Sequence, residues 1–317
     1  MNINDIISLT TTPLTVAVHS GLFHADDAFA VAALRLLSRT RDFRVIRTRN
    51  PEELKTADIR VDVGGKYDSN VMTFDHHQRG GAGGRPNGVK YAGFGLVWRH
   101  FGGAVVRALY PQVSTADIEA VVELVDQELV QPVDAADNGQ KTHVQVEELS
   151  VRNLTVSSLI HALNPTWEEG GSPEEAGRQF DTAVNVASIT LQRFIASALG
   201  KVHAQRVVEE AIASSSDKRL VILDKFVPWM DYVVEYKEPI FVVFENNEGT
   251  WMVQCVPPEA GSFDKRLPLP SGWAGLRDKE FQDATGVEDA VFCHPGRFIC
   301  GAKSRNGALT LAALALG

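Results

Sequence analysis

The histidine and aspartate residues of this chain indicate a metal site. Those that stand in short motifs or at strand ends are His19, His24, Asp26, Asp62, His76, Asp134 and Asp137. Imidazole and carboxylate together suit Mn²⁺, Fe²⁺, Co²⁺ or Zn²⁺, whereas the lack of thiolates is unlike a structural zinc site. These candidates outnumber the ligands that one ion needs. The set therefore predicts two divalent ions that share a bridging carboxylate.

The two neighbours of His76 are candidates for other catalytic roles. Asp75 could orient a ligand, and His77 could contact the substrate or protonate a leaving oxygen. Taken singly, most of the candidates have simpler explanations. Asp26 suits the start of a helix, Asp62 suits a turn before two glycines, and a lone histidine is often a satisfied core residue. The prediction of a metal site therefore rests on their joint placement.

The elements around these residues predict how they are brought together. Residues 25–37 begin with acidic residues and continue with helix formers, as a helix does. Strand-like patterns occupy residues 14–18, 43–48, 59–63 and 71–74. This alternation of strands and helices predicts an α/β fold with a mostly parallel sheet covered by helices.

The candidate ligands follow the ends of these strands. His19, Asp62 and the triplet that contains His76 each come directly after or close to the end of a different strand. In an open parallel sheet, ligands bind at the carboxyl ends of the strands. The segment 133–139 follows a helical region, and we expect it to fold back to the same edge.

Residues 79–95 contain seven glycines and cannot form a regular element. Two interpretations are open: a flexible surface loop, or a mobile flap beside an active site that carries Arg79, Arg85 and Lys90.

The later part of the chain predicts further helices and a second domain. Helices are expected from 94 to about 129 and from 173 to about 214, the latter with an interruption near Gly200. We place the domain boundary at 214–218. Beyond it, a small α+β unit is expected, with strands at 241–245, 251–256, 290–293 and 297–300 and helices at 275–284 and 304–316.

The composition limits the class of protein. The chain has 317 residues, of which 44% are hydrophobic and 22% charged, and a net charge of −9 at pH 7. An ordinary apolar fraction excludes intrinsic disorder, and the acidic balance disfavours a broad surface for duplex DNA. Residues 261–317 carry 7 basic against 6 acidic side chains, whereas residues 1–260 carry 24 against 34. The acidity is therefore concentrated where metal ions are expected.

Cysteine usage and apolar stretches indicate a cytoplasmic protein without a membrane span. Cys255, Cys293 and Cys300 have no CxxC spacing, which predicts buried thiols in place of a disulfide framework. Apolar stretches fall short of the roughly 20 residues that a spanning helix needs. The first fifteen residues lack the pattern of a signal or transit peptide, although a nuclear or organellar location in eukaryotic relatives stays open.

The Asp75-His76-His77 signature, preceded by His19, Asp26 and Asp62, resembles that of the DHH phosphoesterase superfamily. More closely, the chain resembles the Myg exonuclease family (melanocyte-proliferating-gene product-like), whose members are also labelled metal-dependent protein hydrolases. The matching stretches are HSGLFHADDA at 19–28, RTRNPEEL at 47–54, VDVGGKYD at 61–68, DHHQR at 75–79, HFG at 100–102, VDAADNG at 133–139, LNPTW at 163–167, QCVPPE at 254–259 and RLPLPSGWAGLRD at 266–278.

The resemblance implies three parts. Residues 1–170 would form a DHH-type catalytic domain, residues 171–217 a helical connector, and residues 218–317 a smaller α+β substrate-binding domain that closes over a cleft. It also implies two divalent ions, with Mn²⁺ as the first choice and Mg²⁺, Co²⁺ or Zn²⁺ as alternatives.

The resemblance also implies which residues hold each ion. One ion would take His19, His24 and Asp62. The other would take Asp26, Asp62, His76 and either Asp134 or Asp137, a choice that the sequence leaves open. Two positions depart from related sequences: His24 stands where most DHH enzymes have aspartate, and Ala302 stands where relatives have histidine. Substrate phosphates are expected to meet Arg79, Lys265, Arg266, Arg297, Gly301, Lys303 and Arg305.

The function expected from these features is hydrolysis of phosphodiesters at the end of short single-stranded RNA or another oligonucleotide. Alternatives are a DHH-type phosphohydrolase that acts on pyrophosphate, a nucleotide or a cyclic dinucleotide, a hydrolase of a non-phosphate bond, and a non-catalytic regulatory relative. The partner is then a single-stranded nucleic acid or nucleotide and no membrane. The oligomeric state stays open, with a homodimer among the options.

Overall fold

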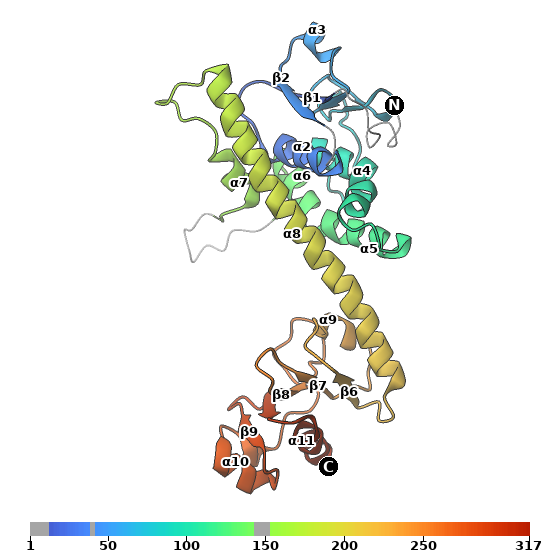
Figure 1. The fold of residues 1–317 in the computed structure, drawn as a ribbon, viewed down its shortest axis with the longest axis vertical. Helices are drawn as coiled ribbons and strands as arrows, with labels where there is room; N and C mark the ends of the chain where they lie inside the picture. Colours follow the sequence, from blue (N-terminus) through green and yellow to red (C-terminus); the bar gives the residue numbers. More distant parts are fainter. Residues whose placement is uncertain (1–12, 39–41, 143–152) are drawn as a thin grey trace. The chain divides into compact units, whose positions relative to one another are not determined.

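A computed structural model describes residues 13–38, 42–142 and 153–317 of the chain. It divides into two compact units, residues 1–199 and 200–317, which we describe separately (Figure 1). The first residues, on which the predicted location rests, lie mostly outside the described ranges. Helix α8 (Pro173–Ser214) includes residues of both units and is continuous at Gly200, so the predicted interruption there is wrong. A single glycine costs a helix only about 1 kcal/mol, too little to break one that is helical on both sides.

The sheet of the first unit is mostly parallel, as predicted. Its strands, in the order β2-β1-β3-β5-β4, are β2 (Phe43–Arg47), β1 (Leu14–Val18), β3 (Ile59–Val61), β5 (Thr73–Phe74) and β4 (Tyr67–Asp68). The first four strands pair in parallel, whereas β4 adds an antiparallel edge. Strand β4 was not predicted, because two residues are too few to show a period.

Helices cover this sheet and build most of the first unit. They are α2 (Ala25–Leu37), α3 (Pro51–Leu54), α4 (Gly93–Leu109), α5 (Thr115–Val125), the π-helical turn η2 (Asp126–Val130), α6 (Gln131–Asp137) and α7 (Val156–His161), with a 3-10 turn η1 (Ser69–Val71). Helix α2 is buried along almost its whole length, because its sequence is nearly all alanine, valine, leucine and phenylalanine after the first turn. It packs against α4, α6 and α7 (Figure 1), and these contacts hold the first turn of α2 in the interior.

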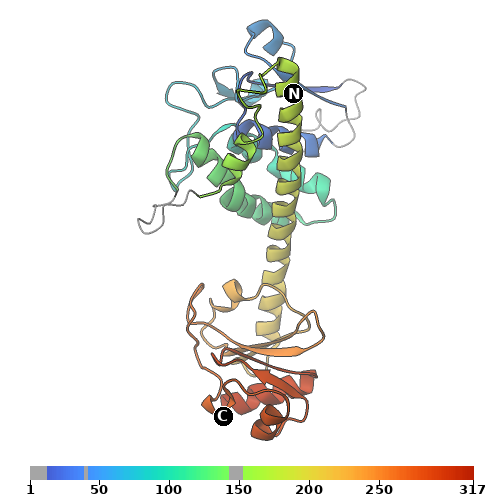
Figure 2. The same ribbon diagram turned by 90° about the vertical axis from the view of Figure 1, so that its left-hand side faces the viewer.

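The second unit is a five-stranded sheet with helices on both faces. The strands follow the order β6-β7-β8-β10-β9, with β6 (Leu220–Leu223), β7 (Phe241–Glu245), β8 (Trp251–Cys255), β10 (Ile299–Ala302) and β9 (Ala290–Cys293). Only β6 pairs in parallel with its neighbour, and it was not predicted. The helices are α9 (Met230–Val233), η3 (Ser271–Trp273), α10 (Asp278–Thr285) and α11 (Arg305–Leu316) (Figure 2).

Each face of this second sheet has its own core. On one face, α10 and α11 pack on the sheet around Phe281 and Leu311. On the other face, the last turns of α8 and the segment around α9 pack around Val208 and Trp229. The three cysteines are free and buried in the first of these cores, as predicted. Within the described ranges, no helix is both long and apolar enough to cross a membrane.

Candidate metal centre

The parallel strands of the first unit deliver the predicted residues to one edge of the sheet. His19 follows β1, Asp62 follows β3, and Asp75 begins the triplet after β5. These three strands are neighbours and run in the same direction. Their carboxyl ends therefore meet, and the side chains that follow them lie within a few ångströms of one another.

Asp62 lies at the middle of this group. Its carboxylate is 3.4 Å from His19 Nε2, 3.3 Å from His76 Nε2 and 3.2 Å from His77 Nδ1. Its backbone has a φ of 50°, a left-handed conformation that aspartate tolerates better than most residues. Burial opposes ionisation, but the neighbouring histidines outweigh it and hold the pKa of Asp62 well below its ordinary value. Asp62 is therefore a permanent anion that three imidazoles face.

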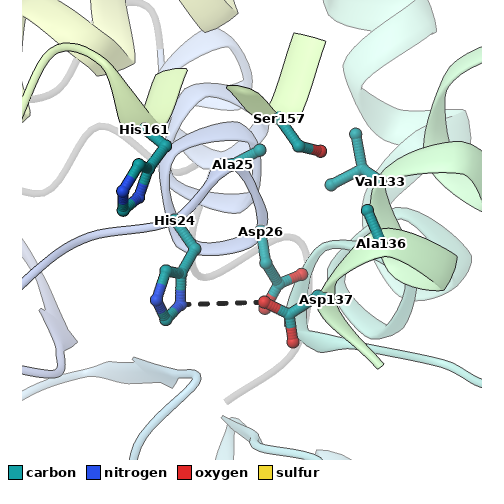
Figure 3. Close-up of a pocket in the computed structure, with 8 residues that line it drawn as sticks. All are labelled: His24, Ala25, Asp26, Val133, Ala136, Asp137, Ser157 and His161. Carbon is teal, nitrogen blue, oxygen red and sulfur yellow. Dashed lines mark ion pairs between the residues drawn. The ribbon is translucent and has the colours of Figure 1, made fainter. Parts of the chain in front are cut away.

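His76 joins this carboxylate to helix α6. His76 Nε2 lies 3.1 Å from Asp137 Oδ2, and His24 Nδ1 lies 3.7 Å from Asp137 Oδ1 (Figure 3). Burial disfavours a charged His76, yet the carboxylates of Asp137 and Asp62 prevail and raise the pKa of His76 to about 11. Without a metal ion, a proton on His76 thus supplies the positive charge that these carboxylates require.

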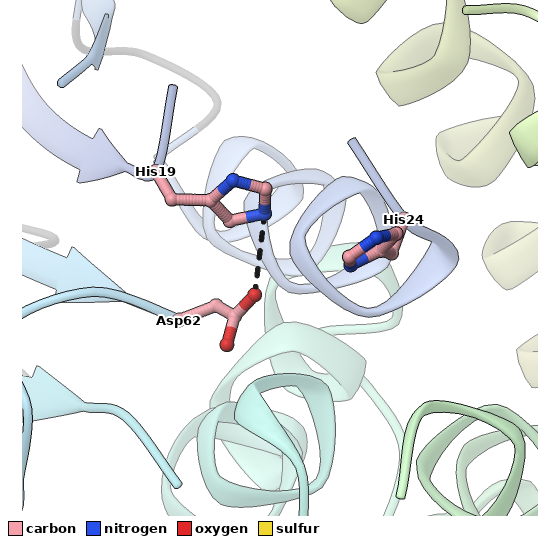
Figure 4. A group of neighbouring side chains, drawn as sticks. All are labelled: His19, His24 and Asp62. Atoms are coloured by element: carbon pink, nitrogen blue, oxygen red, sulfur yellow. Dashed lines mark ion pairs between the residues drawn. The ribbon is translucent and has the colours of Figure 1, made fainter. Parts of the chain in front are cut away.

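His19 is held in the orientation that a metal ligand needs. Its Nδ1 lies 3.1 Å from the backbone oxygen of Ser20. Because a carbonyl oxygen only accepts hydrogen bonds, Nδ1 carries a proton, and Nε2 is the nitrogen whose lone pair can bind a metal ion. His19 Nε2 faces Asp62 (Figure 4) and also lies 3.2 Å from Asp27 Oδ2. His24 stands on the other side of the same space, at the start of α2.

Asp27 is a residue of this site that sequence reasoning treated only as a helix-capping residue. It caps helix α2 and also faces a histidine of the site, because its Oδ1 accepts a hydrogen bond from the backbone N–H of His24 and its Oδ2 faces His19. The carboxyl is fully buried, and this burial raises its pKa despite the attraction of His19. Its position beside Asp26 was the available signal, but a helix cap explained both residues.

Asp26 is buried against the first turn of α4. Gly93 N and Phe94 N donate hydrogen bonds to its two oxygens at 2.9 and 2.6 Å. A Cβ at position 93 would lie 2.9 Å from Asp26 Oδ2, so glycine is required for this approach. Burial and the neighbouring carboxylates, Asp62 first among them, raise the pKa of Asp26 well above its ordinary value.

The two candidate aspartates of helix α6 have different surroundings. Asp137 faces His76 and His24, whereas Asp134 forms a buried ion pair of 2.8 Å with Arg85 and accepts a hydrogen bond from Gly95 N. Arg85 also binds Asp126 in the π-helical turn η2. Burial raises the pKa of Asp134 to about 7, because its effect exceeds the opposite effects of Arg85 and of the backbone hydrogen bond from Gly95. We call Arg85, Asp126 and Asp134 the arginine cluster.

The glycine-rich segment is pinned to the fold at Arg85, which is buried in the arginine cluster. Arg85 is therefore not a substrate-facing residue of a mobile flap, because its guanidinium is already bound by two carboxylates. Arg79 and Lys90 of the same segment are exposed.

Asp75 and His77 sit at the border of the site. Asp75 Oδ2 accepts a hydrogen bond from Gly65 N at 2.6 Å, and its Oδ1 lies 2.9 Å from His77 Nδ1. The His77 side chain is 62% exposed, while Asp75 is buried. The anions Asp62 and Asp75 raise the pKa of His77 to about 9, against the effect of partial burial. His77 is thus a protonated, solvent-facing imidazole that Asp75 orients.

The donor set fits divalent cations. Six buried side-chain atoms have no hydrogen bond of acceptable geometry within the described part of the chain, and four of them belong to this site: His19 Nε2, Asp27 Oδ2, Asp62 Oδ1 and His76 Nε2. Such atoms cost free energy unless something else satisfies them. Three groups bring one ligand atom from each member within 4.8 Å of one another: His19, His24 and Asp62; Asp62, His76 and His77; and Asp26, His76 and Asp137. We call His19, His24, Asp26, Asp62, His76 and Asp137 the candidate metal centre.

A pocket of about 270 Å³ opens beside this centre (Figure 3). His24, Asp26 and Asp137 form one part of its wall, and Ser157 and His161 of helix α7 form another. Sequence reasoning missed both α7 residues. Nothing in the sequence around them marks a site, and only the packing of α7 against α2 and α6 brings them here.

The basic residues predicted to bind substrate are divided between the units. Arg79 belongs to the first unit, and Lys265, Arg266, Arg297, Gly301, Lys303 and Arg305 belong to the second. Arg266 donates to the backbone oxygens of Val234, Tyr236 and Pro239, so it supports the fold.

The other second-unit residues differ in how far they are available. Arg297 donates to the backbone oxygen of Leu269, and the guanidinium of Arg305 lies over the ring of Trp251 at 5.8 Å. Lys303 and Arg305 are exposed near the start of α11, whereas Ala302 is buried.

A family model and several known proteins match this chain over nearly its whole length. Residues 15–316 match the MYG1_exonuc family, described as an uncharacterised protein family (UPF0160). The human protein named MYG1 exonuclease is 34% identical over 324 residues, which cover 95% of this chain and 85% of the relative. MYG1 protein YER156C of Saccharomyces cerevisiae is 32% identical over 322 residues, with 95% of each chain covered. No solved structure matches.

Proposed function

The chain belongs to the MYG1 exonuclease family, and we propose that it is a two-metal phosphodiesterase that removes nucleotides from the end of short single-stranded nucleic acid. The observation that carries this proposal is the convergence of four buried, unsatisfied nitrogen and oxygen atoms at the carboxyl edge of the parallel sheet. The human relative is named an exonuclease, which favours a nucleic-acid substrate among the possible phosphodiesters.

The residues would hold the ions in two overlapping sets. His19, His24 and Asp62 form the first set, and Asp26, Asp62, His76 and Asp137 form the second, with Asp62 common to both. We assign Asp137 and not Asp134 to the second set, because Arg85 neutralises Asp134. Bound divalent ions would lower the pKa of a water molecule and stabilise negative charge on the phosphate oxygens.

The protein residues prepare the site for this chemistry. Ser20 and Asp27 orient His19, and the first turn of α4 holds Asp26 in place through two backbone hydrogen bonds. The ring of His77 faces solvent, and Asp75 Oδ1 lies 2.9 Å from its Nδ1. In its protonated form it can donate a proton to the leaving oxygen of the substrate while Asp75 keeps the ring in position.

The pocket lined by Ser157 and His161 gives the substrate a place beside the ligands His24 and Asp137. In the second unit, Lys265, Arg297, Lys303 and Arg305 remain our candidates for contacts with neighbouring phosphates. Such contacts would supply a positive surface to a chain whose overall charge is negative.

The direct test is release of nucleotides from an end-labelled oligoribonucleotide by the purified protein with Mn²⁺. His76→Ala should abolish release, because it removes a ligand that faces both Asp62 and Asp137. His203→Ala is the matched control, since His203 is an exposed histidine of helix α8, and this variant should retain full activity. The proposal fails if the wild type releases no nucleotide with any divalent ion, or if His76→Ala is as active as the control.

Substrate panels separate the proposal from its alternatives. The same preparation should be offered a single-stranded DNA, a pyrophosphate and a cyclic dinucleotide. Faster turnover of one of the small phosphates than of any oligonucleotide would make this a phosphohydrolase with a different natural substrate.

A further inference from the structure

Another pocket of the first unit, of about 420 Å³, has lining residues that differ from those of the pocket beside helix α7. Its wall includes Ser20, Gly21 and Leu22, which directly follow His19 in the chain. Another part of the wall is the segment between α7 and α8, including Asn164 and Trp167. We propose that this pocket binds a nucleobase of the substrate by stacking it on Trp167, next to the phosphate at the metal centre. This inference rests on the proposed function.

Trp167 has the exposure that a stacking platform needs. Its side chain is 89% exposed, and the neighbouring Leu22 is 57% exposed. A large indole left in solvent costs free energy that burial against a flat apolar partner would recover. Every nucleobase has such a flat face, and aromatic side chains bind single strands in this way.

The wall of the pocket is held by hydrogen bonds and begins at the residue after His19. Asn164 accepts a hydrogen bond from Phe23 N and donates one to Phe23 O, both at 2.9 Å, so it ties the two parts of the wall together. The backbone oxygen of Ser20, in the wall, lies 3.1 Å from His19 Nδ1 in the metal centre. A nucleotide with its phosphate at the metal ions therefore has the pocket within reach of its base.

Arg47 brings a positive charge to the wall of the pocket, and no acidic residue is among the described residues that line it. The guanidinium of Arg47 is fixed by the backbone oxygens of Gly21 and Ala176 and lies over the rings of Phe23 and Phe180. The lining residues are flanked in the chain by Glu168, Glu169, Glu174 and Glu175, so the stacking surface and not the charge carries the inference.

The pocket offers few groups that could read the edge of a base. The Asn164 amide is occupied by Phe23 and His161, and the Thr166 hydroxyl accepts from Glu169 N. Recognition by stacking alone predicts weak sequence preference, as an exonuclease that degrades mixed sequences requires.

The test compares wild type, Trp167→Ala and Trp167→Phe, each with Mn²⁺, on oligoribonucleotides of one sequence. One substrate is intact, and others carry a single abasic residue at successive positions from each end. Trp167→Ala should raise KM for the intact strand by about 5- to 150-fold with little change in kcat, and Trp167→Phe should restore most of the loss. Ile189→Ala, which truncates another exposed apolar side chain of the same unit, should have no effect.

The abasic series identifies the base that stacks. In the wild type, one abasic position should raise KM as much as Trp167→Ala does, and the same position should have no further effect in Trp167→Ala. An unchanged KM for Trp167→Ala overturns the inference, and so does an equal loss on intact and abasic strands. A wild type that cleaves no strand at all refutes the proposed function, which is a different result.

Discussion

Two buried charged clusters meet at helix α6 and differ in how their charges are balanced. In the arginine cluster, Arg85 binds Asp126 and Asp134, so the charges are neutralised by the chain itself. The candidate metal centre consists of carboxylates and imidazoles, and several of their atoms have no hydrogen bond within the described part of the chain. The charges of the first cluster are balanced by an arginine, whereas those of the second are balanced by protons on histidine and could instead be balanced by bound cations.

This difference separates a structural role from a functional one. The arginine cluster holds the glycine-rich segment, η2 and the first turn of α4 together. The metal centre lies at strand ends beside an open pocket, where a substrate can enter. Changes in the arginine cluster should therefore reduce stability, and changes in the metal centre should reduce metal binding and activity.

The largest effect is expected from Asp62→Asn. The change removes the carboxylate that both sets of ligands share while keeping its size. Losing it removes several kcal/mol of transition-state stabilisation, so kcat should fall by at least about 1,000-fold. The metal-free variant should unfold at a lower denaturant concentration than the metal-free wild type at neutral pH, because the lowered pKa of Asp62 means that its ionised carboxylate stabilises the fold. A variant that keeps a tenth of the wild-type rate would contradict the assignment.

Arg85→Met tests the structural role of the arginine cluster. It leaves the buried carboxylate of Asp134 and the half-buried carboxylate of Asp126 without their cation, and breaking a buried pair in this way costs about 3–5 kcal/mol. Denaturant unfolding of the metal-free protein measures the loss. Arg79→Met is the matched control, because Arg79 is an exposed arginine of the same segment, and it should leave stability unchanged. Equal stabilities of the two variants would show that the arginine cluster does not hold the segment.

Asp137→Asn and Asp134→Asn compare the two aspartates of α6 directly. Asp137→Asn should weaken binding of the second ion by at least about tenfold, since it removes a carboxylate that faces His76. Asp134→Asn should leave affinity per folded molecule unchanged but reduce stability by about 1–3 kcal/mol. Calorimetric titration with Mn²⁺ and denaturant unfolding give both values. The opposite pattern would move the ligand to Asp134.

The last prediction concerns the effect of pH on metal affinity. With the pKa of His76 raised to about 11 and that of His77 to about 9, both rings carry protons at neutral pH when no metal is bound. A metal ligand must be deprotonated, so binding at His76 releases a proton. Affinity should therefore rise between pH 6 and pH 8, by up to about tenfold per pH unit for each proton released. Titrations in buffers of different ionisation enthalpy count these protons, and a flat profile without proton release would be inconsistent with a metal at His76.

The parallel sheet could be predicted, and so could the convergence of His19, Asp62 and His76 at one edge, because both depend on local patterns. Strands before His19, Asp62 and Asp75 have clear apolar runs, and the carboxyl ends of parallel neighbours must share an edge. Strand β4 was missed because it is only two residues long, and Gly200 was read as a break although its neighbours carry the helix through it.

The choice between Asp134 and Asp137 could not be made from the sequence. Residues three apart on a helix lie on nearly the same side, so periodicity places both near the site. Only the tertiary structure shows that Arg85, from a segment far away in the chain, pairs with Asp134, whereas Asp137 faces His76. For a similar reason Asp27 was taken as a cap, since its second oxygen acquires a role only when His19 lies beside it.

By itself the sequence determined the family, the α/β order of the first unit, and the kinds of side chain that reach the edge of the sheet. Tertiary structure alone decided which carboxylates remain without a cation and which residues line the two pockets, including Ser157, His161 and Trp167. The physical reason is that the state of a buried charge depends on what packs against it. Those neighbours come from segments whose separation in the sequence carries no information about their contact.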